Sequence, residues 1–85
     1  MPRVDLSKNY YRCRQRDPRQ FSKIRTPRWA SHIAGSIVKG AKVVQGKVRG
    51  KDEWKVQSVL IPRARGRSRA EALKYAKAIK EKIEG

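Results

Sequence analysis

The sequence of 85 residues contains one cysteine, Cys13, and one histidine, His32. A single cysteine cannot form a disulfide within the chain, and the two residues together cannot supply the ligand set of a structural zinc site. We therefore expect an intracellular protein that holds no metal and no other cofactor.

Long apolar runs are also absent. The longest uninterrupted run covers Val59 to Pro62, whereas a membrane span requires roughly 20 apolar residues. Arg3, Asp5 and Lys8 near the start are followed by no apolar stretch, so we expect no secretory signal. The expected location is the cytoplasm, in association with a nucleoid, a virion or a ribosome, and no membrane partner is expected.

Acidic side chains are scarce: 7 Asp and Glu stand against 23 Lys and Arg, which gives a formal charge of +16. In a chain of this size such a charge repels itself unless an anion neutralises it. Nine basic residues lie in residues 1–28 and nine in residues 29–67, but only five in the last eighteen. The acidic residues are scattered and form no acid–base pair. We therefore expect a polyanionic partner, DNA or RNA, with no small-molecule substrate and no enzymatic activity.

The segment from Arg69 to Glu84 predicts a helix. Ser68 and Glu71 have the spacing of a capping box, in which the serine hydroxyl accepts from the third helical N–H. Apolar residues then recur at helical spacing and form one stripe. They are Ala72, Tyr75, Ala76, Ile79 and Ile83.

Two alternating segments, residues 41–48 and 54–61, predict an antiparallel hairpin joined by a turn at Gly50. Strict alternation gives the hairpin an apolar face of Val44, Val48, Trp54, Val56 and Leu60. It leaves a polar face of Gln45, Lys47, Arg49, Lys55 and Gln57. We expect the hairpin to pack on the C-terminal helix.

Thr26 and Pro27 have the pattern of an N-cap and a first helical turn, and Trp29, Ala30, Ile33 and Ile37 follow at helical spacing. This predicts a helix over residues 27–39, with a strand through "SIV" as the alternative. Residues 1–25 show neither period and are expected to form an extended basic arm that becomes ordered on its ligand. The predicted fold is thus a single small α+β domain over residues 26–85, with a hairpin or three-stranded sheet, a C-terminal helix and a shorter first helix.

Arginine occupies every second position from Arg63 to Arg69, and this run combined with the polar face of the hairpin is the strongest functional feature. In an extended segment the four guanidinium groups would form one row that binds phosphate oxygens bidentately. The row leads into a helix N-terminus, where an anion is also favoured; the alternative is a flexible charged loop. The residues expected to contact phosphates are Arg63, Arg65, Arg67 and Arg69 of this run, Lys47, Arg49 and Lys55 of the hairpin, and Arg12, Arg14 and Arg16 of the arm. Gln45 and Gln57 are expected to read base edges.

Other polar and aromatic residues leave two interpretations open. His32 could serve as a general base on an RNA hydroxyl, although a lone histidine on a helix is more often a surface or packing residue. The arginines on either side of Cys13 would favour its thiolate. Trp29 and Trp54 are expected in the core, whereas Tyr10 and Tyr11 could anchor the arm or stack on bases.

The stretch "DEWKVQSVLIPRARGRSRAEALKYAKAIKEKI" resembles the strand, loop and helix that end two nucleic-acid modules. One is the arm-site DNA-binding domain of phage-type integrases, which implies a three-stranded sheet against one helix, with the sheet in the major groove. The other is the double-stranded RNA-binding domain. The residues that match its last helix are Ser68, Arg69, Glu71 and Ala72, but Ala70 and Leu73 stand where that family has lysine.

The central stretch "IRTPRWASHIAGSIVKGAKVVQGKVRGKDEWKVQSVLIP" resembles small uncharacterised proteins of archaea and their viruses, with a "G-K-x-x-G" hairpin and a "V-Q-S" strand. A composition rich in Lys, Arg and Glu is typical of heat-adapted organisms. The expected function is a non-enzymatic nucleic-acid-binding protein that contacts mainly phosphates and leans toward double-stranded DNA. An RNA-binding protein of a ribosome or other ribonucleoprotein is the first alternative, and a small ribonuclease that uses His32 is the second.

Overall fold

The computed structural model describes residues 3–85 of the chain. Five strands, two α-helices and one short 3-10 helix follow one another along it. In chain order they are β1 (Arg3–Leu6), β2 (Tyr10–Arg14), η1 (Pro18–Gln20), β3 (Phe21–Arg25), α1 (Arg28–Ile37), β4 (Lys42–Val48), β5 (Trp54–Pro62) and α2 (Arg69–Glu84).

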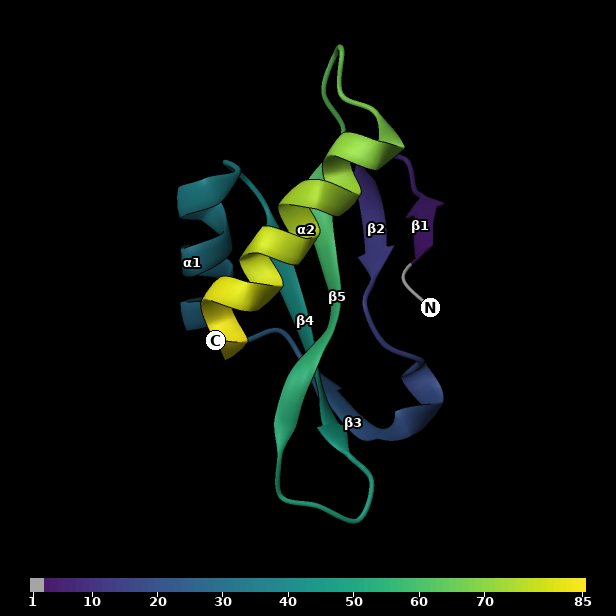
Figure 1. Ribbon diagram of the computed structural model, residues 1–85, viewed down its shortest axis with the longest axis vertical. Coiled ribbons are helices and arrows are strands. Elements are labelled where there is room, and N and C mark those ends of the chain that lie inside the picture. Colours follow the sequence, from purple (N-terminus) through teal and green to yellow (C-terminus); the bar gives the residue numbers. More distant parts are fainter. Residues whose placement is uncertain (1–2) are drawn as a thin grey trace.

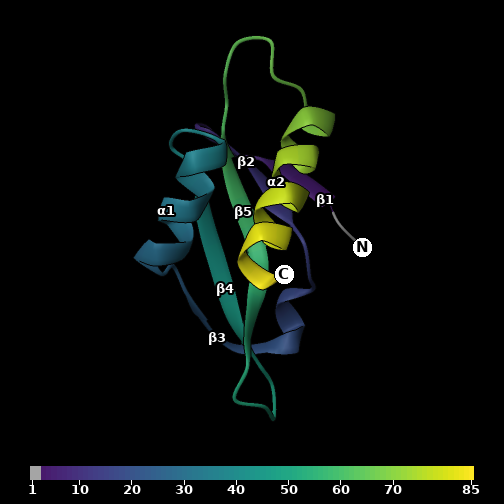
Figure 2. The same ribbon diagram turned by 60° about the vertical axis from the view of Figure 1, so that its left-hand side comes forward.

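The strands form one antiparallel sheet in the order β1-β2-β5-β4-β3, and both helices pack on the same face of it (Figure 1). α2 crosses β5 and β2, whereas α1 lies beside it over β4; the turned view shows both helices in front of the strands (Figure 2). The molecule is elongated, with extents of 41 × 23 × 21 Å. Within the described residues, neither helix has the length and apolar character that a membrane crossing demands. The fold is therefore two layers, with one sheet face left without a helix.

The helix predicted for residues 69–84 is confirmed with the same bounds. The Ser68 side chain accepts from the Glu71 N–H at 3.1 Å, as expected for an N-cap serine. The predicted stripe also faces the sheet: Ala72, Ala76 and Ile79 are fully buried. This helix starts and ends where local signals in the sequence place it.

Small side chains bring the helices close to the sheet. Four of the five buried residues in the two helices are alanines: Ala30 and Ala34 in α1, Ala72 and Ala76 in α2. The sheet contributes β-branched and aromatic residues to the same core, which include Tyr11, Val43, Val56, Val59 and Ile61. The core is consequently thin, as expected for a chain of this length.

The predicted hairpin of β4 and β5 is confirmed, but its predicted faces are wrong. Val44 pairs with Ser58 and Gln45 pairs with Val56, so Gln57 is an extra residue in β5 and forms a β-bulge. A bulge shifts the alternation by one residue from that point on. Upstream of the bulge Val56 therefore faces the helices, as Val59 does beyond it, and Gln45 lies on the helix side with them.

The extended N-terminal arm is also a wrong prediction. Three of the five strands come from the segment predicted as an arm, namely β1, β2 and β3. β2 pairs with β5 and β3 pairs with β4, so both are integral to the sheet that was expected to hold at most three strands. Residues 1 and 2 of the predicted arm lie outside the described residues.

The first helix is confirmed, and the strand alternative over the same residues is wrong. Its N-cap is Pro27 rather than the predicted Thr26, and no side chain caps it. Trp29 is not in the core but is 50% exposed, because the alanines of α1 face the sheet instead. Gly40 lies beyond the helix end with φ +84°, in the turn that leads to β4.

A partly exposed ion pair fastens the end of α2 to the sheet. The Glu84 carboxylate accepts from Arg16 at 2.8 Å and from the Val56 N–H at 2.6 Å, and Arg16 also donates to the Val56 carbonyl. Partial burial raises the pKa of Glu84, but the hydrogen bonds from Arg16 and Val56 outweigh it and hold this pKa below its ordinary value of 4.5. The carboxylate is therefore charged at neutral pH and links helix, strand and the segment after β2.

Replacing Glu84 by glutamine is expected to lower the free energy of unfolding by about 1–2 kcal/mol at neutral pH, because Arg16 loses its charged partner. The pKa of Glu84 is lower in the folded state than in the unfolded state. The ion pair therefore stabilises the fold fully at pH values above 4.5, and this stabilisation is lost as the pH falls through the folded-state pKa. Thermal melts of wild type and variant across pH test it. The two melting temperatures should differ at pH 7 and converge in acid; a difference that is constant with pH would contradict this account.

Candidate nucleic-acid interface

The sheet face that carries no helix is the first candidate interface. Cys13, Val59 and Val43 are register partners in β2, β5 and β4 and belong to the core under the helices. Residues that alternate with them point to the other side of the sheet. We call this side the open sheet face. From β1 to β4 it presents Arg3, Asp5, Tyr10, Arg12, Arg14, Leu60 and Lys42.

Three arginines from β1 and β2 are neighbours on the open sheet face. Arg3 is the register partner of Arg14, and Arg12 is the partner of Asp5. The Asp5 carboxylate lies 3.0 Å from the Arg3 guanidinium and 3.7 Å from that of Arg14. The hydrogen bond from Arg3, together with the charges of Arg3, Arg14 and Arg12, holds the pKa of Asp5 below its ordinary value. One carboxylate thus pairs with two guanidinium groups and lies opposite a third, that of Arg12, which leaves net positive charge on this face.

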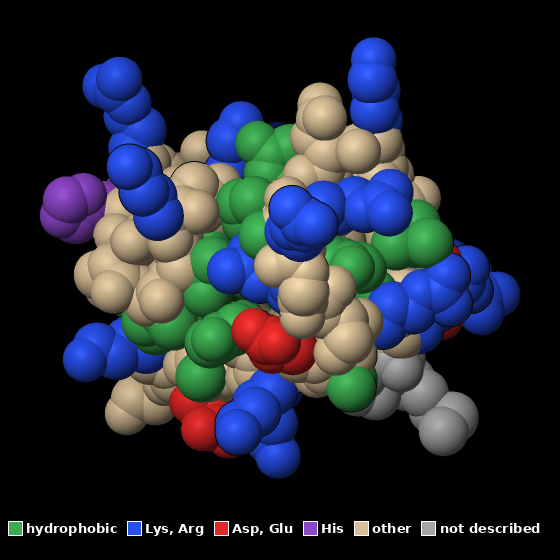
Figure 3. Space-filling view, turned by 90° about the horizontal axis from the view of Figure 1, so that it is seen from above, with side chains coloured by type: hydrophobic (Ala, Val, Ile, Leu, Met, Phe, Trp, Pro, Cys, Tyr) green, Lys and Arg blue, Asp and Glu red, His purple; other side chains and the backbone are tan. Residues whose placement is uncertain are grey.

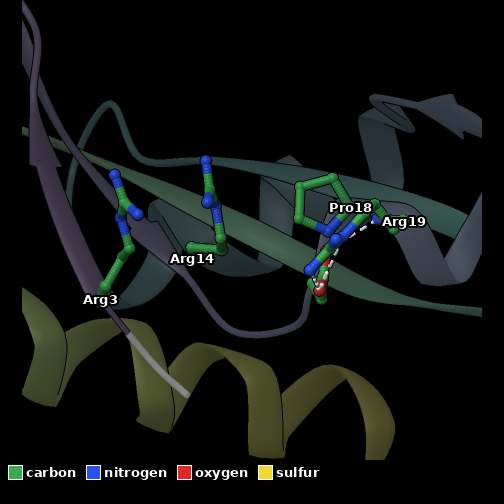
Figure 4. Close-up of a pocket in the computed structure, with 5 residues that line it drawn as sticks. Arg3, Arg14, Pro18 and Arg19 are labelled. Atoms are coloured by element: carbon green, nitrogen blue, oxygen red, sulfur yellow. Dashed lines mark hydrogen bonds and ion pairs between the residues drawn. The ribbon is translucent and has the colours of Figure 1, made fainter.

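A hollow of about 540 Å³ opens beside Arg3 and Arg14 and is bordered on its other side by Pro18 and Arg19 of η1. Asp17 is the N-cap of η1 and accepts from the Arg19 backbone at 2.9 Å and from its guanidinium at 3.0 Å. These hydrogen bonds lower the pKa of Asp17. Figure 4 shows Arg3 and Arg14 extending away from α2, with Arg19 across the hollow. Arginines from three separate segments therefore border one hollow that is open to solvent.

Aromatic and aliphatic groups continue the open sheet face toward β4. The Lys42 ammonium lies 5.6 Å from the centroid of the Tyr10 ring, and both side chains belong to this face. Tyr10 and Leu60 are half-buried, whereas Lys42 and Arg12 are exposed. The face therefore combines cations with apolar surface on which a sugar or a base can rest.

Basic side chains outnumber their carboxylate partners throughout residues 3–85. Six of them form ion pairs within 4.0 Å, which leaves seventeen of the 23 without one. No acidic residue occurs between Asp17 and Asp52, the stretch that holds β3, α1 and β4. In the view along the long axis, Lys and Arg side chains project all round the outline (Figure 3). The Asp and Glu side chains visible there lie in the lower half of the picture and at its right edge.

The row of four arginines predicted between β5 and α2 is wrong, because the chain turns at residues 65 and 66 instead of running extended. Gly66 has φ +83°, a left-handed conformation that suits glycine. Arg67 folds back to donate to the Pro62 carbonyl at 2.6 Å, and Arg63 donates to the Ser7 carbonyl at 3.2 Å. Arg65 and Arg69 remain exposed at the loop and the start of α2. The loop is therefore a smaller basic site than expected.

The glutamines predicted for base readout are buried, each only 3% exposed. Gln45 accepts from the Arg25 guanidinium at 3.0 Å, and Gln57 is the bulge residue. Neither side chain can therefore contact a base edge in this fold, and the prediction that both lie on an exposed polar face of the hairpin is wrong. Gln45 lies on the helix side of β4, as the buried Val43 does, whereas Gln57 is the extra residue of β5.

The other predicted contact residues are dispersed. Arg12 and Arg14 lie together on the open sheet face, but Arg16 is engaged by Glu84 on the helix side. Lys47 and Lys55 pair with acidic residues of the hairpin at 3.6 and 3.1 Å, and Arg49 donates to the Arg19 carbonyl. The structure thus brings together only part of the predicted set.

Cys13 is buried, and burial raises the pKa of its thiol to about 11. The expectation that its arginine neighbours favour the thiolate is therefore wrong, because alternation points those side chains to the opposite face. His32 is exposed on α1. Within residues 3–85, no three His, Cys, Asp or Glu side chains gather as a metal site would require.

No protein-family model, no curated protein and no solved structure matches this chain.

Sequence reasoning missed three basic residues of the open sheet face and the hollow beside it: Arg3, Arg19 and Lys42. A signal for the face itself was present in "YYRCR", where Tyr11 and Cys13 alternate with Arg12 and Arg14. Such alternation is typical of a strand with one buried side. Extending that pattern to β1 would have placed Arg3 beside them.

Proposed function

We propose that the protein is a non-enzymatic nucleic-acid-binding protein that contacts phosphates through its open sheet face. The observation that carries this proposal is the group of Arg3, Arg12 and Arg14 on a sheet face without a helix, where Asp5 is the one carboxylate beside them in the described part of the chain and pairs with only two of the three. Guanidinium groups match the geometry of phosphate oxygens and remain charged at any working pH. A polyanion would relieve the repulsion among them.

The remaining charge supports the same proposal. The exposed cations around the sheet, which include Arg19 and Lys42, extend the positive surface beyond the three arginines. Arg65 and Arg69 add a second positive site at one end of the molecule. With Gln45 and Gln57 buried, the hairpin contributes no base-edge readout, so binding should depend on phosphates more than on sequence.

The experiment that tests the proposal is a titration of the purified protein against duplex DNA and structured RNA of equal length at two salt concentrations. If about six phosphates are neutralised, affinity should fall by roughly 10³ between about 50 and 200 mM salt. DNA and RNA of equal length carry similar numbers of phosphates, so a difference between their affinities shows which nucleic acid the protein prefers. A response to salt that is flat, or an absence of binding at low salt, would overturn the proposal.

A further inference from the structure

A second hollow lies on the helix side of the sheet, at the end of the molecule where α1 begins and α2 ends. It has a volume of about 330 Å³ and is bordered by Trp29 of α1, by Trp54 of β5, by Arg25 of β3 and by Ile83 of α2. Both tryptophans of the chain therefore line one site, although they are 25 residues apart in sequence. We call this site the tryptophan cleft.

Arg25 is fixed in the tryptophan cleft by two neighbours. Its guanidinium carbon lies 4.0 Å from the centroid of the Trp54 ring, and its Nε donates to Gln45 at 3.0 Å. Arg25 is nevertheless exposed, so its outer side faces solvent. A planar guanidinium held on an indole offers a flat surface on which another aromatic ring can stack.

Trp29 supplies the other aromatic surface of the cleft. It is 50% exposed, although α1 has its alanines against the sheet and does not need this side chain for packing. The buried residues of α1 are Ala30 and Ala34, so the packing of this helix on the sheet does not account for an indole at position 29. Its exposure next to Arg25 and Trp54 points to an aromatic ligand.

The charges around the cleft favour an anionic ligand over a cationic one. The two carboxylates that border it are already engaged, since Glu84 binds Arg16 and the Val56 N–H, and Glu53 lies 3.1 Å from Lys55. Arg25 has no carboxylate partner among the ion pairs of residues 3–85. The ligand should thus carry both an aromatic ring and negative charge.

We propose that the tryptophan cleft binds an unpaired nucleobase of a single-stranded nucleic acid, stacked on Trp29 and on the Arg25–Trp54 pair. The proposal rests on the proposed function, since the phosphates of the same strand would be held by the basic surface. A base inside a duplex is covered on both faces by its neighbours, whereas an unpaired base can leave the stack and enter a cleft. The cleft therefore selects for single-stranded segments or loops.

The test compares two single-stranded oligonucleotides of equal length and charge, one of thymidines and one of abasic sugars. Stacking on aromatic side chains makes the thymidine strand bind roughly tenfold more tightly. Trp29→Ala should remove this advantage and leave the affinity for the abasic strand unchanged. The control Leu6→Ala removes another exposed apolar side chain, at the opposite edge of the sheet, and should change neither affinity.

Fluorescence gives a second measurement that does not depend on affinity. The variant Trp54→Phe leaves Trp29 as the only tryptophan, and its emission should be quenched by the thymidine strand but not by the abasic one. Equal affinities for the two strands, or unquenched Trp29 emission on binding, would overturn the base site while the phosphate-binding function stands. Binding of duplex DNA without binding of either single strand would overturn the base site alone, whereas failure of the single strands and of duplex DNA to bind at low salt would overturn both proposals.

Discussion

Replacing Arg3, Arg12 and Arg14 together by glutamine is expected to weaken nucleic-acid binding by roughly a hundredfold at low salt. These side chains form the positive centre of the open sheet face, where the Asp5 carboxylate pairs with Arg3 and Arg14 and leaves Arg12 without an ion pair among residues 3–85. If each neutralises one phosphate, the slope of log affinity against log salt should become shallower by about 2.7. Binding isotherms of wild type and variant over a series of salt concentrations measure both quantities.

A matched control variant distinguishes the effect of the open sheet face on affinity from the effect of the net charge. Lys74, Lys77 and Lys82 are exposed on α2, and replacing all three by glutamine lowers the net charge by the same amount. This control should keep most of the affinity and a salt slope close to that of wild type. If both triple variants lose the same affinity, the total charge and not the open sheet face governs binding.

The parts of the fold that sequence predicts are those fixed by local chemistry. The Ser68 cap, the stripe behind it and the turn at Gly50 need no distant partner, and the helix and hairpin they predict are confirmed. By contrast β2 pairs with β5 across some fifty residues of chain, so its five residues carry too little pattern to identify the pairing. The predicted arm failed for this reason.

The interface was harder to predict than the fold because one inserted residue reverses the faces of a strand. The bulge at Gln57 puts Val56 on the same side of the sheet as Val59, and no residue type in the sequence predicts it. The turn at Gly66 likewise breaks the alternation from Arg63 to Arg69. Trp29 was assigned to the core by its helical spacing, but alanines meet the sheet in its place. Residue type and spacing indicated a basic binding protein, whereas the positions of its sites depend on backbone irregularities.

Replacing Gly46 by alanine is expected to lower the free energy of unfolding by about 3 kcal/mol. Gly46 lies in β4, and a Cβ there would come within 3.0 Å of three atoms of the Phe21 ring. Phe21 is buried at the start of β3, so its ring covers this position of the sheet. The Gly46 backbone does not have positive φ, which means that the cost is steric and not conformational. Urea denaturation of the variant measures the loss.

A double-mutant cycle identifies the clash as the cause. Phe21→Leu alone should destabilise the protein by removing part of a buried ring, but adding Gly46→Ala to it should cost much less than adding Gly46→Ala to wild type. Additive losses in the cycle would show that Phe21 does not occupy the space above Gly46. Because β3 is an edge strand that pairs only with β4, displacement of the Phe21 ring should loosen β3 first. The tryptophan cleft depends on Arg25 of the same strand, so Gly46→Ala should also weaken the preference for the thymidine strand over the abasic one.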